Sequence, residues 1–259
     1  MDLYWLEQSE TDLPDENDWL SANEILRFEG LRFAKRRADW RLGRWTAKRA
    51  VSMCLGSPAF HFSLASMEVR NSASGVPAVV FDDQAAPVTI SLSHRNGRAL
   101  CTVADAGFAL GCDLEVIEAR SDAFVVDYFT AEEQALVARQ SAAERPRTLA
   151  LLWSAKESAL KALHAGLRLD TRSVVVDLLD AAFSQVGVWR PLQVVYSAGP
   201  LFHGWWQNAD GMVRTIVAAP APGLPIQLEN GDSHGGASLF PWSGSLPAAQ
   251  RGSALPVPR

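Results

Sequence analysis

The 259-residue sequence carries a formal net charge of −5, with 48% apolar and 20% charged residues. This composition is ordinary for a globular protein, and no apolar stretch approaches the roughly 20 residues that span a bilayer. The sequence starts with acidic rather than basic residues, so we expect neither a signal peptide nor a membrane anchor. The three cysteines form no CxxC pair, which argues against a disulfide framework and a zinc site. We therefore expect a cytoplasmic protein.

Positive charge is concentrated in one segment of the chain. Residues 27–49 contain nine basic and two acidic side chains, so this segment carries +7 and the remainder −12. A basic segment within an acidic protein predicts a focused anion site. A nucleic-acid-binding module is an alternative that predicts salt-sensitive binding to DNA or RNA, and the acidic remainder disfavours it.

The first part of the chain is predicted to contain two helices followed by strands. Ser21–Glu24 fits a capping box and predicts the start of a first helix. A second helix is expected from about residue 35 to residue 55, with four basic residues at helical spacing: Arg37, Arg41, Arg44 and Lys48. Alternating apolar residues and turn residues then predict strands at 67–70, 78–81, 88–92, 99–104 and 109–117.

The second part repeats this order of elements. A capping box at Thr130–Glu133 predicts a helix through about residue 139, and a longer helix is expected from 147 to 165 with Gly166 as its cap. Further strands are expected at 173–178, 192–196, 202–206 and 213–218. We find no clear sequence repeat between the two parts. From about Pro220 the chain is rich in Pro, Gly, Ser and Ala, which predicts a disordered or loosely attached tail.

Two acidic residues two positions apart are the first candidate site. Asp113 and Glu115 lie on one face of a predicted strand, with Leu114 on the other. Paired carboxylates suit a hard cation such as Mg²⁺. The alternative is a half-exposed strand whose acids are solvated.

A helical face and a strand end are the next candidates. Trp153, Glu157 and Lys161 share one helical face, where Glu157 could supply a third carboxylate and Lys161 a phosphate contact. A surface Glu–Lys pair, worth about 0.2–0.5 kcal/mol, is the alternative. Ser93 and His94 end an apolar strand and could contact phosphate, although a histidine there is often structural.

The basic helical stripe can be interpreted in two ways. Its arginines could form a cradle for a multiply charged phosphate ligand, or the stripe could be a solvated helix face. The GxSxG elbow, the Walker A loop, the GxGxxG fingerprint and HExxH are all absent from the sequence. The candidate chemistry is therefore a metal with phosphate rather than a serine hydrolase or a nucleotide-binding loop.

Taken in order, these segments resemble the 4'-phosphopantetheinyl transferase superfamily, in its monomeric, Sfp-type branch. GCDLE (111–115) is similar to the family's G-(I/V)-D-(I/L)-E motif, WSAKESALK (153–161) to W-(S/T)-x-K-E-(S/A)-x-x-K, and SLSH (91–94) to (S/N)-x-S-H. FTAEE (129–133) resembles an F-(S/T)-x-x-E stretch and GLRL (166–169) a G-x-G-L-type turn. The likeness spans roughly residues 25–218, and the order of the motifs is more specific than any one of them.

The resemblance implies an α+β fold of two similar subdomains, each a small, mainly antiparallel sheet packed against helices. The expected division is 1–106, 107–219 and a tail at 220–259, with coenzyme A and Mg²⁺ in the cleft between the subdomains. The implied activity transfers 4'-phosphopantetheine from coenzyme A to a serine of an apo acyl or peptidyl carrier protein and releases adenosine 3',5'-bisphosphate. The implied protein is a monomer that binds neither nucleic acid nor membrane.

The resemblance also implies a role for each candidate residue. Asp113, Glu115 and Glu157 would surround Mg²⁺, and Glu157 would help to deprotonate the incoming serine. Lys161 would contact the pyrophosphate and assist the leaving group, and Lys156 would support the same helix face and belong to the coenzyme A-binding residues. The coenzyme A phosphates and ribose would be contacted by Ser93 and His94, and its 3'-phosphate end by three residues of the basic helix: Arg36, Arg41 and Arg44.

Two positions depart from the family pattern. The family's G-(K/R)-P turn is Gly75-Val76-Pro77 here, so one basic phosphate contact is missing. His94 is followed by Arg95, where many relatives have a small residue, and Arg95 could replace the lost charge. A non-catalytic homologue that only binds carrier protein or coenzyme A is the alternative function.

Overall fold

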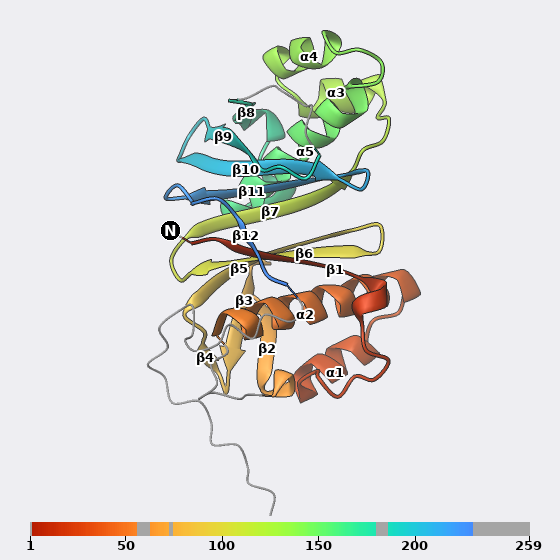
Figure 1. Cartoon of the computed structure of the whole chain (residues 1–259), viewed down its shortest axis with the longest axis vertical. Helices are drawn as coiled ribbons and strands as arrows, with labels where there is room; N and C mark the ends of the chain where they lie inside the picture. The colour runs from red at the N-terminus through yellow and green to blue at the C-terminus, as the bar shows by residue number, and fades with distance from the viewer. Residues whose placement is uncertain (1, 56–62, 73–74, 180–185, 230–259) are drawn as a thin grey trace, which may run out of the picture.

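The computed structural model describes residues 2–55, 63–72, 75–179 and 186–229. Helices and mainly antiparallel sheets alternate along the chain, which confirms the predicted α+β class. Figure 1 shows two sets of strands stacked at the centre of the molecule, with helices packed on their outer sides. Within the described residues, no helix combines the length and the apolar character needed to cross a membrane.

The first half of the chain forms the lower part of the molecule in Figure 1. Its longest helix packs against the two central strands, β1 and β6, and buries Ala47, Val51 and Cys54 in the first apolar core. The strands form one sheet in the order β12-β1-β6-β5, to which the end of the chain contributes β12 (Ile226–Gln227), and a second sheet in the order β2-β3-β4. The elements are β1 (Tyr4–Ser9), η1 (Glu10–Asp12), α1 (Ala22–Glu29), α2 (Ala34–Leu55), η2 (Leu64–Ser66), β2 (Met67–Asn71), β3 (Pro77–Phe81), β4 (Gln84–Ala85), β5 (Val88–Arg95) and β6 (Arg98–Asp105).

The second half forms a five-stranded sheet in the order β7-β11-β10-β9-β8, in which all neighbours are antiparallel. Helix α5 packs along β7 and β11 and buries Leu152, Ala155 and Leu160 in a second core. The elements are β7 (Ala109–Val116), α3 (Asp122–Tyr128), α4 (Ala131–Ala138), α5 (Arg145–Ala162), η3 (Gly166–Arg168), η4 (Thr171–Ser173), β8 (Val174–Asp177), β9 (Arg190–Tyr196), β10 (Leu201–Ala209) and β11 (Met212–Ala219).

The two halves are joined by apolar and polar contacts. A third core, which includes Leu100, Leu114 and Ile216, draws residues from both sheets. The strongly buried Arg214 of β11 binds Glu7 of β1, with its Nε 2.5 Å from Oε2 and its Nη2 2.7 Å from Oε1. Because both apolar area and an enclosed ion pair cross the boundary, the halves form one packed unit.

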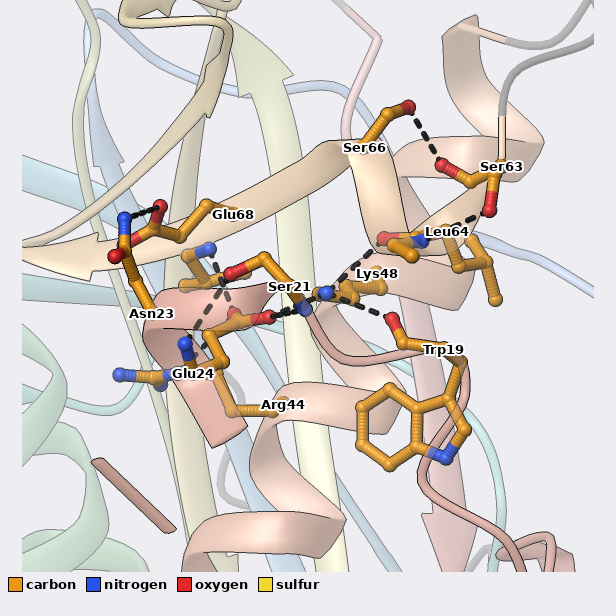
Figure 2. Close-up of polar contacts among 12 residues, drawn as sticks. Trp19, Ser21, Asn23, Glu24, Arg44, Lys48, Ser63, Leu64, Ser66 and Glu68 are labelled. Carbon is orange, nitrogen blue, oxygen red and sulfur yellow. Dashed lines mark hydrogen bonds and ion pairs between the residues drawn. The ribbon is translucent and has the colours of Figure 1, made fainter. Parts of the chain in front are cut away.

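A buried ion pair anchors the long helix of the first half (Figure 2). The Lys48 side chain is fully buried and pairs with Glu24, which closes the capping box at the start of α1. The Lys48 ammonium also donates to the carbonyls of Trp19 (2.9 Å) and Leu64 (3.0 Å), and Glu24 Oε1 accepts the N–H of Val69 (3.0 Å). One charged pair thus ties α1, α2 and β2 together.

The second half contains the same arrangement. Lys156 on α5 is fully buried and lies 2.8 Å from Glu133, which closes the capping box of α4. Lys156 also donates to the carbonyl of Thr171 (2.8 Å), while Glu133 Oε1 accepts the N–H of Val176 on β8 (3.0 Å). The sequence expectation of no repeat is therefore wrong, since Trp-Thr-Ala-Lys at 45–48 and Trp-Ser-Ala-Lys at 153–156 occupy equivalent places.

The structure confirms the expected helices and strands within a few residues and adds elements that the patterns did not predict: β1, α3 and the short strands β4 and β12. Helix α5 ends at Ala162 rather than near 165, and His164 has a positive φ of 55°. The last strand, β12 (Ile226–Gln227), pairs parallel with β1, and Leu228 is 1% exposed in the first core. The expectation of a loose tail is therefore wrong for the segment up to 228, and the tail from residue 230 onward lies outside the described residues.

Candidate functional site

A cavity of about 350 Å³ lies between the two halves. The first half lines it with α2, β5 and the turn before β3, and the second half with the end of α5. Its polar lining is mainly basic or neutral, with Asp39 as its acid. The side chains used below are Trp40, Arg44, Asn71, Val76, His94 and Lys161.

Asp113 on β7 lies where the two halves meet. Gly111 permits this approach, because a Cβ atom there would stand 1.8 Å from the carbonyl oxygen of Ser158 on α5. Asp113 Oδ1 accepts from Lys161 Nζ (2.8 Å) and from Ser93 Oγ of β5 (2.8 Å). Asp113 Oδ2 is buried and has no hydrogen-bond partner. One acceptor atom of this carboxylate is thus free for a ligand.

Lys161 connects the acidic cluster to the cavity. Its side chain is 29% exposed, lines the cavity, and also donates to the Cys112 carbonyl at 2.9 Å. Burial lowers the pKa of Lys161, but Asp113, Cys112 and Glu157 together raise it above its usual value, so the ammonium stays charged. A fixed positive charge therefore stands at the cavity wall.

Glu157 lies near the other two acids. Burial raises the pKa of Glu157 to about 7, with Asp113 and Glu115 adding to the effect and Lys161 opposing it. A carboxyl group with a pKa near neutrality can accept a proton at physiological pH. Glu157 precedes Lys161 by four residues on α5, so the two side chains share one face of the helix.

Glu115 has a different environment. Burial raises its pKa and Asp113 adds to this, while Arg95 and Arg120 oppose it. Arg120 Nη2 is 3.1 Å and Arg95 Nε 3.5 Å from Glu115 Oε2. Two guanidinium groups therefore hold the Glu115 carboxylate. Among the described residues, no arginine forms such an ion pair with Glu157.

The donor chemistry of the cluster fits a hard divalent cation. In the described residues, no group of three or more His, Cys, Asp or Glu side chains is already arranged to hold a metal ion. Asp113 Oδ2 has no hydrogen-bond partner, and burial beside Asp113 and Glu115 raises the pKa of Glu157. Oxygen ligands of this kind suit Mg²⁺, which keeps several waters and takes few protein carboxylates.

The structure brings several predicted site residues together. Asp113, Glu157 and Lys161 converge from β7 and α5, and Ser93 reaches them from β5. His94 lines the cavity, with its Nε2 3.8 Å from Asp39 Oδ2.

Arg44 is the member of the basic helix that lines the cavity. Only 6% exposed, it donates to Asn71 Oδ1 at 3.0 Å and stacks over Trp40. Burial lowers the pKa of Arg44 to about 10, so the guanidinium remains charged near neutrality.

Other predicted residues lie elsewhere. Arg41 donates to Asn17 Oδ1 and to the carbonyls of residues 14–16, so its guanidinium fixes the loop before α1. Arg36 is exposed and is not part of the cavity wall. The buried pairing of Lys156 with Glu133 separates its ammonium from the cavity, which corrects the expected coenzyme A contact. Arg95 also lies outside the wall and holds Glu115 and Glu118 instead.

Three residues of the site were not predicted. Trp40 and Asn71 line the cavity and hold Arg44, and Arg120 holds Glu115. Asn71 stands just before a turn, which is the only local signal at that position. Trp40 precedes Arg44 by one helical turn, so helical spacing could have identified it.

Comparison with known proteins places the chain. A sequence model of the 4'-phosphopantetheinyl transferase superfamily matches residues 109–197. The holo-[acyl-carrier-protein] synthase of Streptococcus agalactiae serotype III (strain NEM316) is 29% identical over 84 residues, which are 32% of this chain and 71% of that protein. The same-named protein of Streptococcus sanguinis (strain SK36) is 33% identical over 84 residues, 32% of this chain and 69% of that protein. The chain belongs to the 4'-phosphopantetheinyl transferase superfamily.

The superfamily match coincides with one part of the site. Residues 109–197 include β7, which carries Asp113 and Glu115, and α5, which carries Glu157 and Lys161. The cavity wall formed by α2 and β5 lies outside the matched segment. Superfamily membership therefore rests on the second half, and the first half adds the basic wall.

Proposed function

We propose that this chain transfers 4'-phosphopantetheine from coenzyme A to a serine hydroxyl of an apo acyl or peptidyl carrier protein, releasing adenosine 3',5'-bisphosphate. The observation that carries the proposal is the convergence of Asp113, Glu157 and Lys161 beside a cavity with a basic wall. The synthases it resembles are named for the same type of carrier protein.

The proposed reaction needs a base, a leaving-group contact and a site for a polyanion. In this proposal Glu157 takes the proton of the serine hydroxyl, directly or through a bound water, from its place beside Asp113 and Lys161. The serine oxygen forms a bond to the phosphorus on the pantetheine side, and the bond from that phosphorus to the bridging oxygen breaks. Its electron pair goes to the adenosine bisphosphate, where the Lys161 ammonium stabilises the new charge.

The first half binds the other end of coenzyme A in this proposal. Arg44 offers a charged guanidinium held between Trp40 and Asn71, which suits the 3'-phosphate. Ser93 and His94 lie between this wall and Asp113, at a place for the pyrophosphate or ribose. Holding the ligand at both ends would position its reacting phosphorus before the carrier arrives.

A divalent cation completes the proposed site. Mg²⁺ bound by Asp113, Glu115 and Glu157 would supply positive charge to the pyrophosphate oxygens. The unpartnered Asp113 Oδ2 supports its placement here. Glu115 would have to share its carboxylate with Arg95 and Arg120.

The finer assignments belong to the same proposal. We place the chain in the monomeric, Sfp-type branch, with subdomains at 1–106 and 107–219 and a cytoplasmic location. The repeated Lys–Glu pairs and the order of elements in each half support the subdomain division. A two-subdomain chain that builds its site between its own halves needs no second copy to do so.

The test is transfer of a fluorescent coenzyme A arm onto a panel of apo carrier proteins, with and without EDTA. Labelling of at least one carrier that EDTA abolishes and excess Mg²⁺ restores is the expected result. Binding of coenzyme A or carrier without any labelling would instead identify a non-catalytic homologue. Labelling that EDTA leaves unchanged would remove the cation from the proposal.

A further inference from the structure

Glu115 belongs to a closed ring of four ion pairs, which we call the Glu115 ring (Arg95, Glu115, Glu118 and Arg120). Arg120 Nη2 lies 3.1 Å from Glu115 Oε2 and 3.1 Å from Glu118 Oε1. Arg95 closes the ring, with Nε 3.5 Å from Glu115 Oε2 and Nη2 2.9 Å from Glu118 Oε1. Each guanidinium is therefore shared between two carboxylates.

The two arginines of the ring are fixed to different degrees. Arg120 follows β7 in the second half, is 24% exposed and lies over the ring of Phe124 at 5.3 Å. Arg95 ends β5 in the first half, is 40% exposed and reaches across the boundary. Arg95 is thus the more solvated cation of the two, and Arg120 is the one stacked on an aromatic ring.

Glu118 controls how much positive charge remains for Glu115. Its carboxylate is 45% exposed, accepts a hydrogen bond from Arg95 and pairs with Arg120, whereas the Glu115 side chain is 11% exposed. Without Glu118, both guanidinium groups would have Glu115 as their remaining carboxylate in the ring. A cation that binds Glu115 must then compete with two positive charges at close range.

We propose that Arg95 is a positioning residue that competes with the divalent cation for Glu115, and that Glu118 weakens this competition by drawing Arg95 away. The inference rests on the proposed function, since it needs a cation at the acidic cluster. It gives this chain a built-in limit on cation affinity. The cation loads fully only when a polyanionic ligand supplies further oxygen ligands.

The experiment measures Mn²⁺ binding, not turnover. Free Mn²⁺ is followed by its electron paramagnetic resonance signal during titration of the full chain, with and without coenzyme A, and Mg²⁺ is added as the competitor. Mn²⁺ takes the same oxygen ligands as Mg²⁺. We expect Arg95→Ala to tighten Mn²⁺ binding and Glu118→Gln to weaken it, each by about three- to tenfold, as for removal of one partly exposed charge.

Opposite directions separate this role from a structural one, because loss of packing would weaken binding in both variants. Glu118→Gln in the Arg95→Ala background should have a smaller effect than in the wild type, since the two residues act through one contact. Arg95→Lys keeps the charge but cannot bridge two carboxylates with one planar group, so its affinity should move toward that of Arg95→Ala.

Arg70→Ala is the matched control. Arg70 is also 40% exposed and also pairs with two carboxylates, Glu68 and Asp83, but it does not touch the acidic cluster. Its Mn²⁺ affinity should equal that of the wild type. Unchanged or weaker Mn²⁺ binding by Arg95→Ala, in a chain whose wild type transfers the fluorescent arm, would overturn the inference alone. Absence of both Mn²⁺ binding and transfer in the wild type would overturn the inference together with the proposed function.

Discussion

The two halves of the chain use the same helix in different ways. On α2, Trp45 and Lys48 are followed by Arg49, and on α5, Trp153 and Lys156 are followed by Glu157. Both lysines are fully buried against a capping-box glutamate, so the anchoring of the helix is common to the two halves. The difference lies one position later, where only the second half carries an acid.

The neighbouring strands differ in the same way. Asp113 and Glu115 stand on β7, while the first strand of the first half, β1, has Glu7 as its acid, which pairs with Arg98 and Arg214. The first half instead places Arg44 in the cavity wall, where α5 has the fully buried Leu152 at the equivalent turn. Anchoring contacts are therefore repeated, whereas the three clustered acids and Lys161 come from the second half and Arg44 comes from the first.

The largest expected effect on the transfer rate comes from substituting Glu157, the acid that has Arg49 at the equivalent place on α2. Glu157→Gln removes the proposed base and should lower the transfer rate by at least about 10²-fold. Arg49→Gln, at the equivalent place on α2, should leave the rate within about twofold, because no part of the reaction is assigned to it. Rates with the fluorescent arm and circular dichroism of both variants check this. Equal rates for Glu157→Gln and the wild type would refute the role of Glu157.

The next largest effect is on stability and tests the buried lysine–glutamate pair that the two halves share. Lys48→Met and Lys156→Met each leave a buried carboxylate without its ammonium, so each should lower the free energy of unfolding by about 3–5 kcal/mol. Lys35→Met removes a lysine whose side chain is 85% exposed and should change stability little. Urea denaturation of the three variants measures this. A large loss in one half and none in the other would show that the repeated pair is not equivalent.

Arg44→Ala tests whether the basic wall of the first half binds coenzyme A. Loss of this guanidinium should raise the KM for coenzyme A about tenfold with a smaller change in kcat, as expected when a charge-assisted phosphate contact is removed away from the reacting atoms. Arg70→Ala, which removes a half-exposed arginine outside the cavity wall, is the control. Steady-state kinetics at varied coenzyme A concentration decide the matter, and an unchanged KM for Arg44→Ala would contradict its placement at the ligand.

The smallest expected effect is a lower KM for coenzyme A. Val76 lines the cavity where the family pattern has a basic residue. Val76→Lys adds a flexible, solvated charge, so it should lower the KM for coenzyme A by about threefold, corresponding to less than 1 kcal/mol. Val76→Met is the matched control, with similar length and no charge. A lower KM in both variants would attribute the gain to apolar contact instead.

Much of this architecture could be predicted from local sequence. The capping boxes at Ser21–Glu24 and Thr130–Glu133 were found because their hydrogen bonds close within three residues. Alternating apolar residues located most strands, since one face of each is buried. Strand β12 was missed because its pairing with β1 depends on residues more than 200 positions earlier, and its own composition favours a loop.

The candidate site was predictable to a lesser extent. Helical spacing placed Arg41, Arg44 and Lys48 on one stripe but could not tell which partner each would meet. The partners are a loop for Arg41, the cavity wall for Arg44 and the buried Glu24 for Lys48. These outcomes depend on tertiary contacts across 20 or more residues, which no periodicity encodes. The repeated Trp-x-Ala-Lys segment is present in the sequence, but its structural role depends on the burial of both lysines against glutamates that lie elsewhere in the chain.

The pairing of β12 with β1 has a consequence for how the chain is made. Tyr4 lies beside Ile226, and the N–H groups of Ile226 and Leu228 donate to the carbonyls of Leu3 and Trp5 at 2.8 Å. During synthesis, β1 leaves the ribosome before the second half of the chain. One of its two edges pairs with β12, which emerges only after almost all of the second half. We therefore expect one edge of β1 to stay unpaired during cotranslational folding until residues 226–227, more than 200 positions later, have been made.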